Sequence, residues 1–191
     1  MKAAQFFQYA HFWLGARSPL DIHSPFVYHF YSKVLKDKQN YPYYITFRER
    51  YPETRFPGYY FLLNRITHFF KPSGIAFHGN PGPERDSLFS GHPGTTEFTS
   101  VDNSKECNLD MVFLDLRVIH DLGVKAIDPF LQHIHKESVF ILWNLRETPS
   151  THLIWKEFQK LPGVTVSIDL FQTGLIFFNE NLSREEFRLR F

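Results

Sequence analysis

The chain has 191 residues, with 21 Lys and Arg against 20 Asp and Glu and a formal net charge of +1. This near-balance argues against a nucleic-acid-binding protein, which presents a strongly basic face, and no apolar run reaches the roughly 18 residues of a membrane span. A single cysteine, Cys107, excludes an intramolecular disulfide, which favours a reducing, cytoplasmic setting. Together these features predict a folded cytoplasmic protein without nucleic-acid or membrane partners.

Aromatic side chains make up 18% of the chain, and more than half of them precede residue 71. Such residues bury large areas, so the simplest interpretation is a core of bulky side chains. The alternative is that some of them line a pocket or form the surface of a homodimer.

The apolar spacing predicts three helices in the first 70 residues. The first covers residues 3–15. The second begins at Ser24–Pro25, where Ser is suited to the N-cap and Pro to the first helical position. The third covers residues 58–70. The segment 39–57 contains three prolines and is predicted to be an extended connection.

From residue 74 onward, short β-rich runs alternate with helical segments. Strands are expected over 74–78, 95–101, 110–115, 138–143, 163–169 and 174–179, helices over 121–135 and 150–160, and a further extended piece over 187–191. A Gly- and Pro-rich loop separates the first two strands. Strands separated by helices indicate right-handed crossovers and a parallel sheet, and the last two strands indicate an antiparallel hairpin at one edge.

Five segments carry a family resemblance: His23–Tyr28, Asp110–Asp115, Ser138–Asn144, Val164–Phe178 and Phe187–Phe191. They resemble a group of Rossmann-like, S-adenosylmethionine-dependent methyltransferases of class I that is found in Bacteroidetes. The resemblance implies an aromatic-rich helical extension over 1–70 and a truncated Rossmann-like α/β domain over 71–191. That domain would hold a mostly parallel sheet with a C-terminal antiparallel hairpin.

The cofactor turn of this family follows the first strand, where glycines let the backbone approach the ligand closely. Gly79, Asn80 and Gly82 occupy that position in this chain, but Pro81 and Pro83 remove two backbone N–H donors from the turn. The acidic residue that the resemblance implies before the turn is absent. The turn therefore departs from the pattern of the family.

Two carboxylates are candidates for the remainder of a cofactor site. Asp102 follows the expected second strand and is the candidate for the ribose hydroxyls, and Asp115 ends the next strand, where doubly wound folds place ligands. The segment between Gly79 and Asp110 is too short for the usual two crossovers with full helices. Because each lost hydrogen bond to a charged group costs roughly 1.5–3 kcal/mol, the sequence argues against ordinary cofactor binding.

Other chemistry finds little support in the sequence. A metal-assisted branch similar to catechol O-methyltransferase implies carboxylates at the ends of two neighbouring strands. Asp115 fits the first position, but Trp143 and Asn144 occupy the second, which makes a poor site for a hard cation. Asp115 and Asp169 would form an acid–base pair only if folding brought them together. The alternative role of Asp115 is to order a loop.

Two functions therefore stay open. The favoured one is a methyltransferase-like protein with a degenerate S-adenosylmethionine site, without catalytic residues, cofactor or metal, that serves in binding, regulation or assembly. The alternative is an active S-adenosylmethionine-dependent methyltransferase that acts on a small molecule and has an altered cofactor loop. A homodimer through the aromatic N-terminal helices is compatible with the first.

Overall fold

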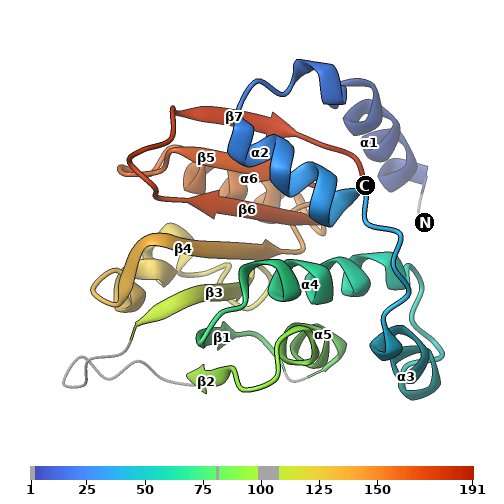
Figure 1. Cartoon of the computed structure of the whole chain (residues 1–191). Coiled ribbons are helices and arrows are strands. Elements are labelled where there is room, and N and C mark those ends of the chain that lie inside the picture. The colour runs from blue at the N-terminus through green and yellow to red at the C-terminus, as the bar shows by residue number, and fades with distance from the viewer. Residues whose placement is uncertain (1–2, 81, 99–107) are drawn as a thin grey trace.

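The computed structural model of the chain describes residues 3–80, 82–98 and 108–191 (Figure 1). Its strands are β1 (Gly74–His78), β2 (Thr96–Phe98), β3 (Leu109–Asp115), β4 (Ile134–Trp143), β5 (Val166–Asp169), β6 (Thr173–Phe177) and β7 (Glu185–Arg188). They form one seven-stranded sheet in the order β2-β1-β3-β4-β6-β5-β7. The first four strands are parallel, and β6 is antiparallel to both of its neighbours. The predicted parallel sheet with a C-terminal antiparallel hairpin is confirmed.

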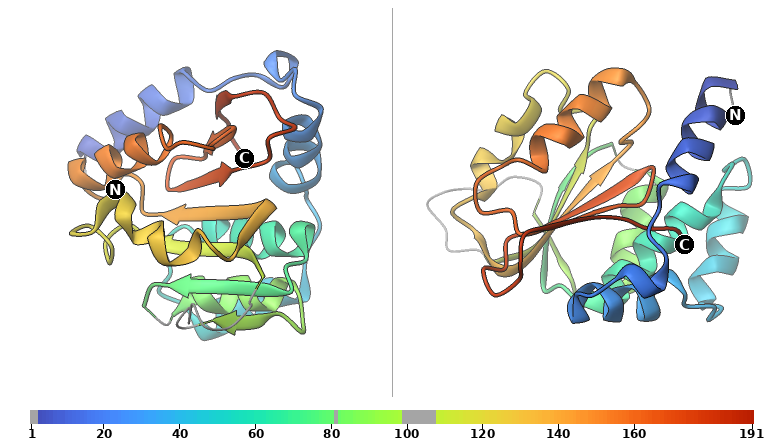
Figure 2. Two further views of the ribbon diagram at one scale, coloured as in Figure 1. Left: turned by 90° about the vertical axis from the view of Figure 1, so that its left-hand side faces the viewer. Right: turned by 90° about the horizontal axis from the view of Figure 1, so that it is seen from above.

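Helices cover both faces of this sheet (Figure 2). The α-helices are α1 (Ala3–Leu14), α2 (Pro25–Phe30), α3 (Pro42–Arg50), α4 (Pro57–Phe70), α5 (Pro83–Gly91) and α6 (Pro149–Phe158), and they are joined by the 3-10 helices η1 (Pro19–Asp21) and η3 (Gly123–Phe130) and the π-helical turn η2 (Tyr31–Leu35). In the described part of the chain, no helix combines the length and the hydropathy needed to cross a membrane.

Two hydrophobic cores lie on opposite faces of the sheet, and the side chains of β3 enter both. Met111 and Phe113 pack with residues of α2, η2, α4 and α5, whereas Val112 and Leu114 pack with residues of η3 and α6. All four residues are buried. The continuous apolar run in the sequence thus corresponds to a strand that is covered on both faces.

The sheet is short at its β2 edge. In the doubly wound order 3-2-1-4-5-6, two strands flank the first strand on that side. Among the described residues, only β2 flanks β1 there, and the connection from β1 to β2 runs through the single helix α5. In the described residues, this edge therefore has one strand fewer than that order, which agrees with the predicted truncation. At the opposite edge, β7 pairs in parallel with β5.

The segment expected to be an extended connection, 39–57, contains the helix α3. Pro42 lies at the first helical position, where its missing N–H costs nothing. The helix brings the rings of Tyr44 and Phe47 to 3.9 and 5.5 Å from the ring of Phe61 on α4. The prediction was wrong because the prolines bound this helix instead of preventing it.

The Gly- and Pro-rich loop after β1 likewise contains a helix, α5. Pro83 lies at its first position, and Glu84 and Asp86 lie in its first turn, where the helix macrodipole favours negative charge. Gly91 ends the helix against α4, since a Cβ atom at this position would lie 2.5 Å from the backbone oxygen of Asn64. Glycine here permits the close packing of the two helices.

The helix expected over 121–135 is replaced by the shorter η3, which ends at Phe130, and by the first residues of β4. Pro129 lies inside the last turn of η3 and has no N–H with which to continue a helix. His135 therefore lies on β4, where its Nε2 atom is 2.9 Å from Oδ1 of Asp110.

Candidate functional site

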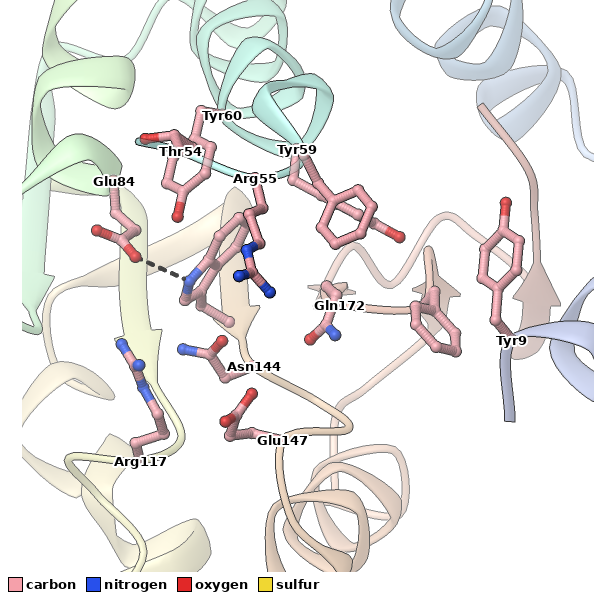
Figure 3. Close-up of a pocket in the computed structure, with 13 residues that line it drawn as sticks. Tyr9, Thr54, Arg55, Tyr59, Tyr60, Glu84, Arg117, Asn144, Glu147 and Gln172 are labelled. Atoms are coloured by element: carbon pink, nitrogen blue, oxygen red, sulfur yellow. Dashed lines mark hydrogen bonds between the residues drawn. The ribbon is translucent and has the colours of Figure 1, made fainter. Parts of the chain in front are cut away.

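A cavity of about 460 Å³ opens at the carboxyl ends of β3 and β4, and we call it the carboxyl-edge cavity (Figure 3). Its walls come from α1, the segment between α3 and α4, the first turns of α4 and α5, and the turns that follow β3, β4 and β5. The lining residues are Tyr9, Thr54, Arg55, Phe56, Tyr59, Tyr60, Glu84, Arg117, Trp143, Asn144, Glu147, Phe171 and Gln172. Doubly wound folds bind ligands at this edge of the sheet.

Three of these lining residues hold a left-handed backbone conformation. The φ angles are 84° at Phe56, 64° at Asn144 and 76° at Phe171, and Lys71 is the fourth non-glycine residue with positive φ among those that the structure describes. Asn tolerates this region, whereas a bulky residue such as Phe is strained in it. Such conformations cost about 1–3 kcal/mol each and cluster at functional sites. Three of the four non-glycine residues with positive φ in the described part of the chain therefore line the carboxyl-edge cavity.

Asp115, at the end of β3, is 2% exposed and joins the turns after β3 and β4. Its Oδ1 atom accepts hydrogen bonds from the Arg117 backbone N–H and from Nδ2 of Asn144, both at 2.9 Å. Its Oδ2 atom accepts a further bond from the Arg117 guanidinium at 2.7 Å. The hydrogen bond to Asp115 raises the pKa of Arg117. The carboxylate is satisfied within the protein and orders both turns.

Glu84 lies in the first turn of α5, beside the indole of Trp143. The indole N–H donates to Oε1 of Glu84 at 3.1 Å (Figure 3). Burial raises the pKa of this carboxyl group. Burial, with the charge of Glu84 nearby, also raises the pKa of Tyr60 to about 12. This corner of the cavity is thus partly desolvated, and hydrogen bonds in it are stronger than in water.

A buried ion pair between Arg146 and Asp169 lies behind the wall of the cavity that α1 and the turn between β5 and β6 form. Arg146 donates to Oδ1 of Asp169 at 2.8 Å, and the two side chains are 8% and 5% exposed. The guanidinium also lies 5.1 Å from the ring centres of both Phe12 on α1 and Phe171. The pair therefore attaches α1 to the turn between β5 and β6. Asp169 pairs with Arg146 and makes no contact that would form an acid–base pair with Asp115.

Of the predicted cofactor residues, the four that the structure describes do not line this cavity. Gly79 and Asn80 form the turn after β1, and Gly82 is the N-cap of α5. Asp115 reaches the cavity only through two lining residues that it binds. Asp102 lies outside the described residues.

Sequence reasoning missed most of the polar residues that line the cavity, among them Thr54, Arg55, Glu84, Glu147 and Gln172. For Glu84 there was a usable signal, because an acidic residue directly after a proline is typical of the first turn of a helix. Arg55 and Gln172 lie in connecting segments with no recognisable motif, and only the fold brings them together.

No protein-family model matches the sequence, and no curated protein matches it. Solved structures do match. A methyltransferase from Geobacter sulfurreducens has a TM-score of 0.55 at 10% identity, over 82% of this chain and 98% of that chain. An O-methyltransferase from Bacillus cereus in complex with S-adenosylhomocysteine has a TM-score of 0.52 at 12% identity, over 78% and 95% of the two chains. The O-methyltransferase TomG from Streptomyces achromogenes, involved in tomaymycin synthesis and in complex with S-adenosylmethionine, has a TM-score of 0.53 at 12% identity, over 78% and 94%.

These similarities show that the chain has the fold of class I O-methyltransferases, as the sequence predicted. Because only about a tenth of the aligned residues are identical, the similarity is one of fold, that is, of the arrangement of helices and strands.

In its described residues, the turn after β1 leaves little room for S-adenosylmethionine beside Gly79. A Cβ atom on Gly79 would lie 3.2 Å from the ring of Phe77 and 3.3 Å from that of Phe113, and these two rings stack with their centres 4.9 Å apart. The protein's own rings therefore fill the space that the glycine leaves. Pro83 offers no N–H at the first position of α5, and the carboxylate of Glu84 already lies in this first turn.

The residues compared above with a metal-assisted site form hydrogen bonds within the protein. Asn144 donates its amide to Asp115, and Trp143 donates its indole N–H to Glu84. Within the described ranges, no group of three His, Cys, Asp or Glu side chains is arranged to hold a metal ion.

Proposed function

We propose that this chain is a methyltransferase-like protein that binds a small molecule in the carboxyl-edge cavity and does not transfer methyl groups. One observation carries the proposal: the rings of Phe77 and Phe113 fill the space beside Gly79, whereas the neighbouring cavity is open. A fold that had kept its donor site would keep room at this turn, because close approach of the backbone is what glycine provides there.

The polar groups near the turn support the same proposal. Asp115 is bonded to Arg117 and Asn144, and Glu84 is bonded to Trp143. These groups are satisfied within the protein, so a donor molecule would have to break existing hydrogen bonds. We further propose that the chain is a degenerate member of the Bacteroidetes-type group, with a helical extension over 1–70.

The test is thermal unfolding with and without S-adenosylmethionine or S-adenosylhomocysteine. A ligand present at a thousandfold its Kd adds about 4 kcal/mol of stability to the folded state. We expect the melting temperature to stay unchanged with either compound at sub-millimolar concentration. A clear rise in melting temperature would contradict the proposal.

The alternative is an active S-adenosylmethionine-dependent methyltransferase with an altered cofactor loop. It draws support from the solved structures of similar fold that hold S-adenosylmethionine or S-adenosylhomocysteine, and from the position of Glu84, which follows the turn and lines the cavity. Under this alternative the same titration raises the melting temperature. Addition of a substrate then converts S-adenosylmethionine to S-adenosylhomocysteine, because the methyl group is transferred to the substrate.

Association of two copies through the N-terminal helices is also part of the proposal. Trp13 and Leu14 on α1 and Tyr28 on α2 are 49%, 79% and 52% exposed. Covering such apolar surface would favour a homodimer. Light scattering at two protein concentrations tests this, and a constant monomer mass would contradict it.

A further inference from the structure

Two charged side chains of the carboxyl-edge cavity make no direct polar contact with another described side chain. Arg55 and Glu147 form no salt bridge and no side-chain hydrogen bond among the residues that the structure describes. Arg117 pairs with Asp115, and the charges of Glu84 and Glu147 also raise the pKa of Arg117. Glu84 accepts a hydrogen bond from the neutral indole of Trp143, which leaves its charge without a counter-charge in direct contact within the described ranges. Among the described lining residues, the cavity thus presents Arg55 as a cation without an ion-pair partner and the carboxylates of Glu84 and Glu147 as anions without a direct one.

Gln172 adds an acceptor without a donor. Its Oε1 atom is buried and has no hydrogen-bond partner. In Figure 3 the polar ends of Arg55, Asn144 and Gln172 point toward the same space. Leaving a buried acceptor unpaired destabilises a protein, so a ligand that donates a hydrogen bond here would remove that penalty.

Aromatic rings form the apolar part of the cavity wall. The ring centres of Tyr60 and Tyr59 lie 5.5 and 6.3 Å from that of Trp143, and on the α1 side Tyr9 meets Phe171 edge to face at 5.0 Å. A flat aromatic group would be held by such rings through stacking and edge contacts.

From these features we infer that the carboxyl-edge cavity binds a zwitterionic aromatic amino acid. Its carboxylate would pair with Arg55, its ammonium group would donate to Oε1 of Gln172 near Glu147, and its ring would lie among the aromatic side chains. This inference rests on the proposed function, because it takes the cavity to be a binding site. The cavity volume, about 460 Å³, lies in the usual range for small-molecule sites.

Ligands with only one of the two charges fit less well. An aromatic acid would leave Glu147 without a counter-charge and Gln172 without a donor. An aromatic amine would leave Arg55 unpaired.

Calorimetric titration of the full chain tests the inference. The probes are L-phenylalanine, L-tyrosine and L-tryptophan, with indole-3-propionate and tryptamine as analogues that each lack one charged group. We expect tryptophan to bind about tenfold or more tightly than either analogue, because each analogue loses a charge-assisted hydrogen bond. Tryptamine binding as tightly as tryptophan, or no binding of any of the three amino acids at millimolar concentration, would overturn the inference.

Two variants locate the carboxylate. Arg55→Gln should weaken tryptophan binding about tenfold or more and leave tryptamine binding unchanged, because tryptamine has no carboxylate. Arg48→Gln is the matched control, since Arg48 is an exposed arginine on α3 that does not line the cavity. Equal effects of the two variants would overturn the assignment of Arg55. S-adenosylhomocysteine is titrated in parallel: its binding contradicts the proposed function, whereas failure of the amino-acid probes contradicts the ligand class alone.

Discussion

Asp115 orders two turns in the structure, although its position in the sequence predicted it as a candidate for binding the cofactor. Its place at the end of a strand made it a candidate site residue, and the structure buries it against Arg117 and Asn144. Which partners it would find could not be predicted, because they depend on how the turns after β3 and β4 meet. The same is true of Arg55 and Gln172.

Asp115→Asn should lower the free energy of unfolding by about 1–3 kcal/mol, because Arg117 loses its ion-pair partner while the amide keeps only part of the hydrogen bonding. Urea denaturation measures the change. Asp121→Asn is the control: Asp121 is 86% exposed, and exposed ion pairs contribute little. Equal effects of the two substitutions would show that Asp115 does not order the turns.

Glu84 gives a prediction for the dependence of stability on pH. Its pKa in the folded protein lies above the ordinary value near 4.5, so the folded state binds more protons than the unfolded state as the pH rises past that value. The free energy of unfolding therefore decreases as the pH rises and this carboxyl group loses its proton. Relative to the parent, Glu84→Gln should therefore gain stability between pH 4 and pH 7, as measured by urea denaturation. A difference that does not change with pH, or that changes in the opposite direction, would contradict the raised pKa.

Among the secondary-structure elements, strands were easier to predict than the helices between them. The continuous apolar runs of β3 and β4 identified strands that are buried on both faces. The helices α3 and α5 were missed because Pro42 and Pro83 were interpreted as breaking helices, whereas each begins one. A proline at the first helical position and a proline in a loop look alike in sequence, and only packing distinguishes them.

The contact between α4 and α5 can be tested at one position. Gly91→Ala would place a Cβ atom 2.5 Å from the backbone oxygen of Asn64 and 2.8 Å from Cβ of Thr67. Overpacking of this kind costs about 1–3 kcal/mol of unfolding free energy. Gly58→Ala, inside α4, meets no atom within 4 Å. It should be neutral or stabilise by up to about 1 kcal/mol. The two melting temperatures give the comparison, and equal shifts would contradict it.

Across the whole molecule, α1 is held against the C-terminal hairpin by Arg146. Its guanidinium binds Asp169 and lies against the rings of Phe12 and Phe171. The backbone N–H of Arg17 also donates to the carbonyl of Arg188 at 2.8 Å. The first helix and the last strands, far apart in sequence, therefore share one wall of the site.

Arg146→Met should destabilise the chain by about 3–5 kcal/mol, because Asp169 would stay buried without a partner. It should also make α1 more sensitive to limited proteolysis. The double variant with Asp169→Asn removes the buried charge and should recover part of the loss in urea denaturation. If the double variant is as unstable as the single one, or if α1 stays resistant, the ion pair does not have this role.

The left-handed residues around the cavity have a consequence for directed evolution. Phe56 is 60% exposed and has a φ angle of 84°, so a glycine there gives up little packing and relieves the backbone. A library selected only for heat resistance should enrich glycine at this position, because natural proteins are seldom at their stability optimum. The selected variants would be more heat-resistant, and the cavity wall at residue 56 would have lost its aromatic ring.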